Sequence, residues 1–87
     1  MEAADLIPYE KVDIYNISNG ERLSTYVIAG GRDSGTICLN GAAARKASRG
    51  DLIIIASYVA LDDDQAWGWS PKCVLLDQEN RIKQQKA

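Results

Sequence analysis

Residues 12–29, VDIYNISNGERLSTYVIA, decide the fold, because they predict two strands joined by a tight turn. Apolar and polar residues alternate over 12–17, which is the pattern of a half-buried strand. Asn19-Gly20 favours the positive backbone φ angles of a type I′ turn, so we expect the chain to reverse there. The return strand, Arg22 to Ala29, then places Arg22 and Tyr26 on one face, roughly 13 Å apart along the strand.

The remaining segments predict more short strands and little helix. Residues 52–61 form a continuous apolar run, which is typical of a fully buried strand. Gly41–Ala47 favours a helix with Asn40 at its N-cap. Several short strands with one short helix predict a mainly β fold, a small β-barrel rather than a sandwich. Other expected elements are a helix tail or turn at 1–7, strands at 36–39 and 72–77, and a frayed polar tail at 78–87.

The composition excludes several classes of protein. A net charge of −2 with scattered Lys and Arg argues against a nucleic-acid partner. No apolar run reaches the length of about 18 residues that a membrane helix needs, and the acidic N-terminus lacks a signal pattern. We therefore expect a cytoplasmic protein with no membrane partner. The chain has no His, which excludes the usual zinc sites and His-based catalysis within it, and we expect no metal.

The small size of the chain favours assembly with partner chains. Its 87 residues include no Phe and only 7% aromatic residues, so a single copy has little material for a core. Cys38 and Cys73 both lie in apolar runs. For a cytosolic protein we expect them to be buried free thiols, and the sequence alone leaves a disulfide open.

The return strand carries the first candidate site residues. Arg22 offers a planar guanidinium that can bind a carboxylate through two hydrogen bonds, and its alternative is a solvated strand residue beside Glu21. Tyr26 has a phenol that can donate a proton at neutral pH. Thr25, on the opposite face of the strand, can donate a hydrogen bond to a developing oxyanion. The alternative for Thr25 and Tyr26 is that they are β-forming residues with cross-strand contacts only.

The segment Asn40-Gly41-Ala42-Ala43-Ala44 is the second candidate. It exposes backbone N–H groups at the start of a predicted helix, where anions bind. Its alternative is a capped helix that packs closely through small residues, and no phosphate-binding motif matches it. We interpret Asp62-Asp63-Asp64 as a solvated loop, because it lacks the spacing of a calcium site. Trp67 and Trp69 are expected to be packing or interface residues, since no basic patch accompanies them.

Three blocks of sequence resemble the pyruvoyl-dependent aspartate 1-decarboxylases. They are NGERLSTY (19–26), ICLNGAAAR (37–45) and GDLIIIASY (50–58), in the family's order and spacing. The resemblance implies a double-psi β-barrel domain at 1–80, followed by a polar tail at 81–87. It also implies a homotetramer with active sites between subunits. The implied reaction converts L-aspartate to β-alanine and CO₂ through a pyruvoyl Schiff base, in the biosynthesis of pantothenate and coenzyme A.

The resemblance also assigns roles to individual residues. Tyr26 matches the catalytic proton donor that acts after CO₂ has left. Arg22 matches a position that binds a substrate carboxylate, and Thr25 matches a substrate contact that is also implicated in self-processing. The remaining substrate-site positions are a pocket-edge aromatic residue, a polar pocket residue and a backbone-lined segment, matched by Tyr15, Asn40, Gly41, Ala42 and Ala43.

One feature of the family has no counterpart in these residues. The family makes its pyruvoyl cofactor from a serine by cutting a Gly-Ser bond, and this chain contains no Gly-Ser dipeptide. We expect that serine to lie upstream of Met1, with the family's first strand and a lysine, so that an N-terminal β chain is a partner of this one. The alternative is a catalytically inactive truncated or divergent homologue that binds small anions or serves assembly.

Overall fold

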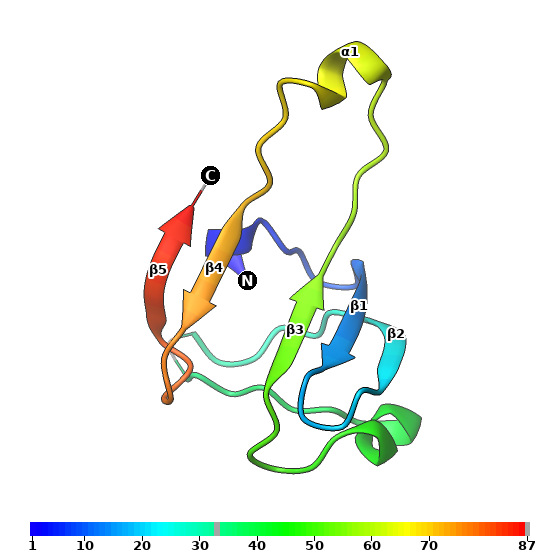
Figure 1. Cartoon of the computed structure of the whole chain (residues 1–87). Coiled ribbons are helices and arrows are strands. Elements are labelled where there is room, and N and C mark those ends of the chain that lie inside the picture. Colours follow the sequence, from blue (N-terminus) through cyan, green and yellow to red (C-terminus); the bar gives the residue numbers. More distant parts are fainter. Residues whose placement is uncertain (33, 87) are drawn as a thin grey trace.

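The computed structural model describes residues 1–32 and 34–86. Strands make up 27% of the chain and helices 15%, which confirms the prediction of a mainly β fold. Within the described residues, the strands form two open sheets and do not close into a barrel (Figure 1). The elements in chain order are η1 (Glu2–Ala4), β1 (Lys11–Asn16), β2 (Arg22–Tyr26), η2 (Gly41–Lys46), β3 (Ile53–Ala56), α1 (Asp63–Ala66), β4 (Cys73–Leu76) and β5 (Ile82–Lys86).

The three-stranded sheet contains the only buried residues among those the structure describes. Its strand order is β2-β1-β3, and β1 pairs antiparallel with both neighbours. Val12 and Ile14 of β1 are each only 3% exposed, because the central strand has a neighbour along each edge. Leu23 and Ile53 are half-buried. The apolar interior of the chain is therefore very small.

The loop between β1 and β2 differs from the predicted type I′ turn. It spans residues 17–21, and of the two expected positions only Gly20 has a positive φ, +78°. The physical reason lies in Asn16, whose side-chain oxygen accepts hydrogen bonds from the backbone N–H groups of Ser18 (3.0 Å) and Asn19 (3.3 Å). These bonds stabilise a wider loop in place of the tight turn.

The second sheet consists of β4 and β5, which pair antiparallel with a bulge between Leu75 and Leu76. Residues 78–87 are therefore not a frayed tail throughout, since Ile82–Lys86 finds backbone partners on β4. The domain boundary at residue 80 stays a prediction. Asn80 donates a hydrogen bond to the carbonyl of Gly35 at 2.8 Å, which ties the long loop after β2 to the turn between β4 and β5 (Figure 1).

Three other expectations were wrong. Residues 36–39 form no strand. The apolar run 52–61 forms a strand only over Ile53–Ala56, and it is not fully buried, since Ile54 and Ile55 are exposed. Beyond it, residues 57–72 form an arm that projects from the sheets and carries α1 at its tip (Figure 1). Cys38 and Cys73 are free, as expected, but both are exposed rather than buried.

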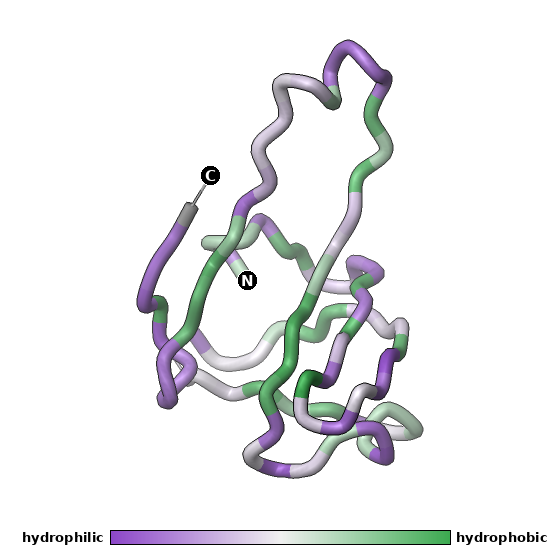
Figure 2. The backbone as a smooth tube through the Cα atoms, in the orientation of Figure 1, coloured by the Kyte–Doolittle hydropathy of each residue, from purple (hydrophilic) through white to green (hydrophobic). Residues whose placement is uncertain are grey.

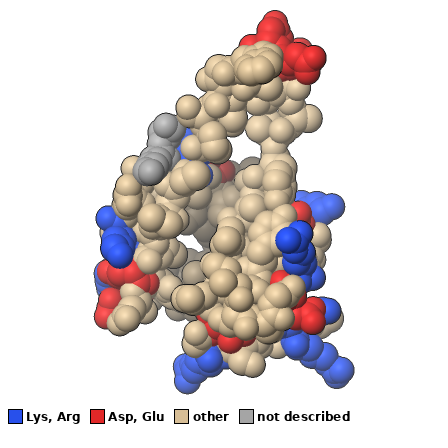
Figure 3. Space-filling view, viewed as in Figure 1, with Lys and Arg blue, Asp and Glu red and all other residues tan. Residues whose placement is uncertain are grey.

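The chain leaves an unusually large area open to solvent. Its accessible surface is 7240 Å², whereas a folded monomer of this mass exposes roughly 5,000 Å². Its radius of gyration is 13.8 Å, against about 12 Å for a compact domain of this length. Apolar residues run along β3 and β4 (Figure 2), and the surface is hollowed between the two sheets (Figure 3). No helix among the described residues has the length and apolar character to cross a membrane.

Candidate active site

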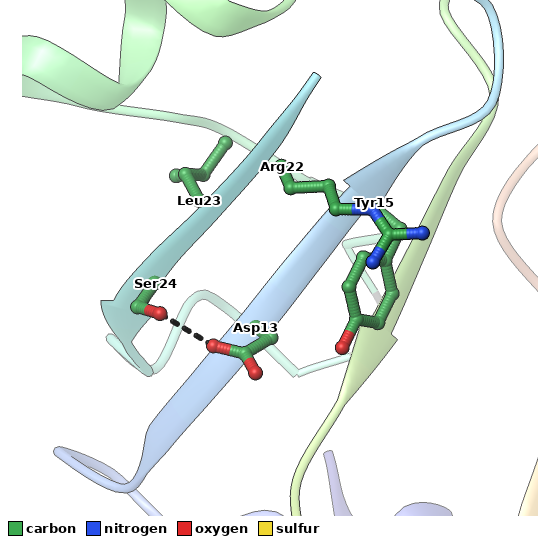
Figure 4. Close-up of a pocket in the computed structure, with 5 residues that line it drawn as sticks. All are labelled: Asp13, Tyr15, Arg22, Leu23 and Ser24. Carbon is green, nitrogen blue, oxygen red and sulfur yellow. Dashed lines mark hydrogen bonds between the residues drawn. The ribbon is translucent and has the colours of Figure 1, made fainter. Parts of the chain in front are cut away.

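One face of the three-stranded sheet brings together several charged and hydroxyl-bearing side chains. β1 and β2 pair with Tyr15 opposite Arg22 and Asp13 opposite Ser24, and directly opposed residues of an antiparallel pair share a face. With Leu23, these residues line an open depression of about 280 Å³ (Figure 4). The register of one hairpin is therefore sufficient to build the depression.

The guanidinium of Arg22 lies over the ring of Tyr15. Its central carbon is 5.0 Å from the ring centroid, which is within the range of a cation–π interaction. Among the described residues, Arg22 forms no ion pair with a carboxylate. The guanidinium is thus held at the depression while its hydrogen-bond donors remain available to an anion.

Tyr15 is fixed from its other side by Tyr58, a residue that the sequence did not single out. The two hydroxyl groups share a hydrogen bond. This bond is the main reason that the pKa of Tyr15 is raised, with burial and the nearby charge of Asp13 adding to it and Arg22 opposing it. Tyr58 lies two residues beyond β3 and contributes to a second depression with Lys11, Val12 and Asp13.

Asp13 brings a negative charge to the same face. Its carboxylate accepts a hydrogen bond from the hydroxyl of Ser24 at 2.5 Å (Figure 4). Lys11 and Arg22 supply positive charges on either side of it along the sheet. The face is therefore mixed in charge, and an anionic ligand is attracted to the Arg22 end rather than to its centre.

Tyr26 lies on the same face as Arg22, as the alternation predicted, but at the other end of β2. It pairs with Lys11 in the ladder, and its ring centroid lies 6.2 Å from that of Tyr9. The side chain is 54% exposed. Tyr26 does not line the depression at Arg22, so the two groups share a surface without sharing a pocket.

Thr25 and the segment 40–43 lie apart from that depression. Alternation along β2 directs Thr25 to the opposite face, where it is half-buried. Asn40 precedes η2 but makes no capping hydrogen bond with its side chain, which instead accepts one from the thiol of Cys38. Gly41 has a φ of +62°, and a Cβ built on it would meet no atom within 4 Å. The backbone at Gly41 is therefore open to a ligand from outside.

A buried asparagine anchors η2 to the sheet. Asn16 is 3% exposed, and its amide nitrogen donates to the carbonyl of Lys46 at 3.1 Å and to the carboxylate of Asp51 at 2.9 Å. The hydrogen bond from Asn16, together with one from the backbone of Ser48, holds the pKa of Asp51 below its ordinary value. The sequence did not single out Asn16, because no local pattern signals its role.

Comparisons with known proteins give one consistent result. The family model described as aspartate decarboxylase matches residues 1–83. The chain is 68% identical over 83 residues to the aspartate 1-decarboxylase of Syntrophus aciditrophicus, covering 95% of this chain and 72% of that protein. It is 52% identical over 87 residues to the aspartate 1-decarboxylase of Ralstonia nicotianae, covering 100% and 72%. The protein of that name from Thermoanaerobacter pseudethanolicus is 53% identical over 81 residues, covering 93% and 69%.

Proposed function

The chain belongs to the aspartate decarboxylase family, and we propose that it supplies the substrate-binding half of a site that converts L-aspartate to β-alanine and CO₂. On this proposal the protein is a cytoplasmic lyase of pantothenate and coenzyme A biosynthesis. The observation that carries the proposal is the guanidinium of Arg22, held at an open depression with no carboxylate of the described chain paired to it.

Arg22 is suited to be the group that selects a dicarboxylic substrate. A guanidinium binds a carboxylate through two parallel hydrogen bonds, which fixes the orientation of the ligand as well as its charge. The cation–π contact with Tyr15 limits the freedom of the Arg22 side chain before a ligand arrives. Less conformational entropy is then lost on binding.

We assign the remaining roles from the family resemblance. Tyr26 is assigned to deliver a proton to the α-carbon of the substrate after CO₂ has left. Its exposure at the end of β2 is compatible with contact to a ligand. Thr25 is assigned to a substrate contact, with further contacts from Tyr15, Asn40, Gly41, Ala42 and Ala43.

The electron sink of the reaction is proposed to be a pyruvoyl group. Such a group would supply the electron acceptor that the breaking of the carbon–carboxylate bond requires. None of the six serines of the chain follows a glycine, so these residues do not fit as its source. We propose that it derives from a serine that precedes these residues, and that the N-terminal β chain released by the Gly-Ser cut is a partner of this chain. The open backbone at Gly41 leaves room for a group that approaches from outside.

We propose that each complete site lies between two copies of the chain in a homotetramer. Arg22 and Tyr26 lie on one face of β2, whereas Thr25 lies on the other. A small substrate cannot contact both faces of one strand. A neighbouring copy resolves this difficulty, and it would also cover part of the excess apolar surface.

The first experiment measures aspartate binding and β-alanine formation by the complete enzyme that contains this chain. Arg22→Ala is expected to abolish detectable aspartate binding in calorimetry, because it removes the carboxylate partner. Arg49→Ala is the control, since it removes an equal charge from an exposed turn. Unchanged affinity in Arg22→Ala would refute the clamp, and binding without any β-alanine formation would favour the anion-binding alternative.

The second experiment tests the division of the site between copies. Arg22→Ala and Asn40→Ala variants are each expected to be inactive, and coexpression of the two should restore activity. If each site takes Arg22 from one copy and Asn40 from its neighbour, random mixing leaves about a quarter of the sites intact. No recovery in mixed tetramers, verified by mass spectrometry, would place both residues in the same copy.

A further inference from the structure

We propose that Tyr58 is a positioning residue, which holds the ring of Tyr15 through their shared hydroxyl hydrogen bond and thereby fixes the guanidinium of Arg22 for carboxylate binding. The inference rests on the proposed function of Arg22 as the carboxylate clamp. It adds a third residue, from a different part of the chain, to a unit that otherwise belongs to one hairpin.

The sheet register explains how three distant residues meet. Tyr15 on the central strand lies opposite Arg22 on β2 and opposite Ile54 on β3. Continuing the register of β1 and β3 beyond Ala56 brings Tyr58 opposite Lys11, on the face that carries Tyr15. The ring of Tyr15 is therefore held from the β3 side by a hydroxyl group and covered from the β2 side by a guanidinium.

The Tyr58–Tyr15 hydrogen bond and the Tyr15–Arg22 cation–π contact act together to order the guanidinium on an exposed surface. A cation–π contact at a solvent-exposed site is individually weak, and a freely rotating ring would not keep a guanidinium in one place. The hydrogen bond shared with Tyr58 removes rotational freedom from the ring of Tyr15, so that the guanidinium is ordered before the ligand binds. An ordered clamp loses less entropy on binding, and its benefit therefore appears in affinity rather than in the rate of the chemical step.

A purely structural role for the Tyr58 hydroxyl does not agree with its surroundings. The residue is 69% exposed and lies beyond the end of β3, so its removal uncovers no core. The two depressions of the face meet at Asp13, which lines both of them. Tyr58 thus belongs to the same continuous surface as Arg22, and the hydrogen bond spans the border between its two parts.

The test removes the hydroxyl oxygen of Tyr58 from the complete enzyme. Tyr58→Phe is expected to raise KM and the dissociation constant for aspartate by about three- to tenfold, which is the range of one lost hydrogen bond. We expect kcat and the unfolding midpoint to stay unchanged. Trp67→Phe, on an exposed aromatic residue of the arm, is the matched control and should change none of these quantities.

Two further measurements separate positioning from a direct contact. In a Tyr15→Phe background, Tyr58→Phe should have no additional effect on affinity, because the bond is already lost. Without any ligand, Tyr58→Phe should lower the ionisation midpoint of Tyr15, read from the ultraviolet absorbance of tyrosinate; Asp13, Lys11 and Arg22 remain as the charged groups on that face. Additive effects on affinity, or an unchanged midpoint, would overturn the inference.

The outcomes also separate this inference from the proposed function. If Arg22→Ala weakens aspartate binding and Tyr58→Phe does not, only the positioning role of Tyr58 is overturned. If Arg22→Ala leaves binding unchanged, the clamp itself is wrong and the positioning role is overturned with it. In that second case a shifted midpoint in Tyr58→Phe would show that the hydrogen bond exists but serves no aspartate site.

Discussion

Each of the two sheets contains one strongly apolar strand, yet among the described residues only the three-stranded sheet has buried side chains. β1 places Val12 and Ile14 at 3% exposure, whereas Leu75 on β4 remains 56% exposed. The difference is one of neighbours rather than of composition, because β1 lies between two strands and β4 pairs with one. Apolar sequence therefore marks surfaces that need a cover, and among the described residues a single copy buries apolar side chains only on β1, since Ile54 and Ile55 of β3 are exposed as well.

The largest expected effect comes from truncating a buried side chain of the three-stranded sheet. Ile14→Ala should destabilise the folded chain by about 2–4 kcal/mol, because it removes buried methyl groups and leaves a cavity. Leu75→Ala, the matched change in the two-stranded sheet, should cost less than about 1 kcal/mol. Urea unfolding followed by circular dichroism measures both. Equal losses would show that β4 is as well covered as β1.

The next effect concerns the polar anchor of the same region. Asn16→Ala should cost about 1–3 kcal/mol, because it leaves the carbonyl of Lys46 and the carboxylate of Asp51 without their shared donor. In the two-stranded sheet, Asn80→Gly removes an exposed hydrogen bond, and glycine adopts the local φ of +60° without strain. This substitution should lower the free energy of unfolding by less than about 1 kcal/mol. A larger loss of stability in Asn80→Gly than in Asn16→Ala would contradict the view that the three-stranded sheet is the better anchored region.

A third change should alter assembly rather than folding. Leu75→Asp places a charge on the exposed apolar surface of β4 and is expected to weaken self-association about tenfold, measured by analytical ultracentrifugation. Gln85→Asp adds the same charge on the other face of that sheet, because it pairs with Val74. If both variants associate like the parent chain, β4 is not part of the interface between copies.

The smallest expected effect is on the pH dependence of stability in acid, to which one carboxylate in each region contributes. The hydrogen bond from Asn16 lowers the pKa of Asp51, and the backbone N–H of Arg81 lowers the pKa of Asp77. A lowered folded-state pKa means that each carboxylate stabilises the fold above its unfolded pKa, and that this contribution is lost as the pH falls through the folded pKa. Asp51→Asn and Asp77→Asn should each flatten the acid limb of a stability–pH curve, and an unchanged limb would contradict the assignment.

The alternation of apolar and polar residues predicted the two strands of the first hairpin, and it failed where a strand depends on distant partners. Alternation located β1 and β2 and correctly put Arg22 and Tyr26 on one face. It could not find β5, because Ile82–Lys86 is mostly polar and becomes a strand through the partners that β4 offers. Apolar sequence also predicted a strand at residues 36–39, which have no neighbouring strand to pair with. It extended the strand at 52–61 past Ala56, where the arm leaves the sheet.

The candidate site was predictable only in its hairpin half. Arg22 and Tyr15 are near in sequence, and the turn between them sets their pairing. Tyr58 lies 43 residues from Tyr15, so only the register of β1 with β3 brings their hydroxyl groups together. Asn16 was missed for a related reason, since its partners are Lys46 at the end of η2 and Asp51 beyond it, and no local spacing connects them to β1.

The arm also gives the protein an optical property. Both of its tryptophans, Trp67 and Trp69, lie on the arm, and Trp67 is 91% exposed. The intrinsic tryptophan fluorescence of the chain therefore reports on the arm alone and is almost blind to the interior around Ile14. Emission should be that of a hydrated indole in the isolated chain, and a blue shift on concentration would signal that the arm has become covered by a neighbour, without any added label.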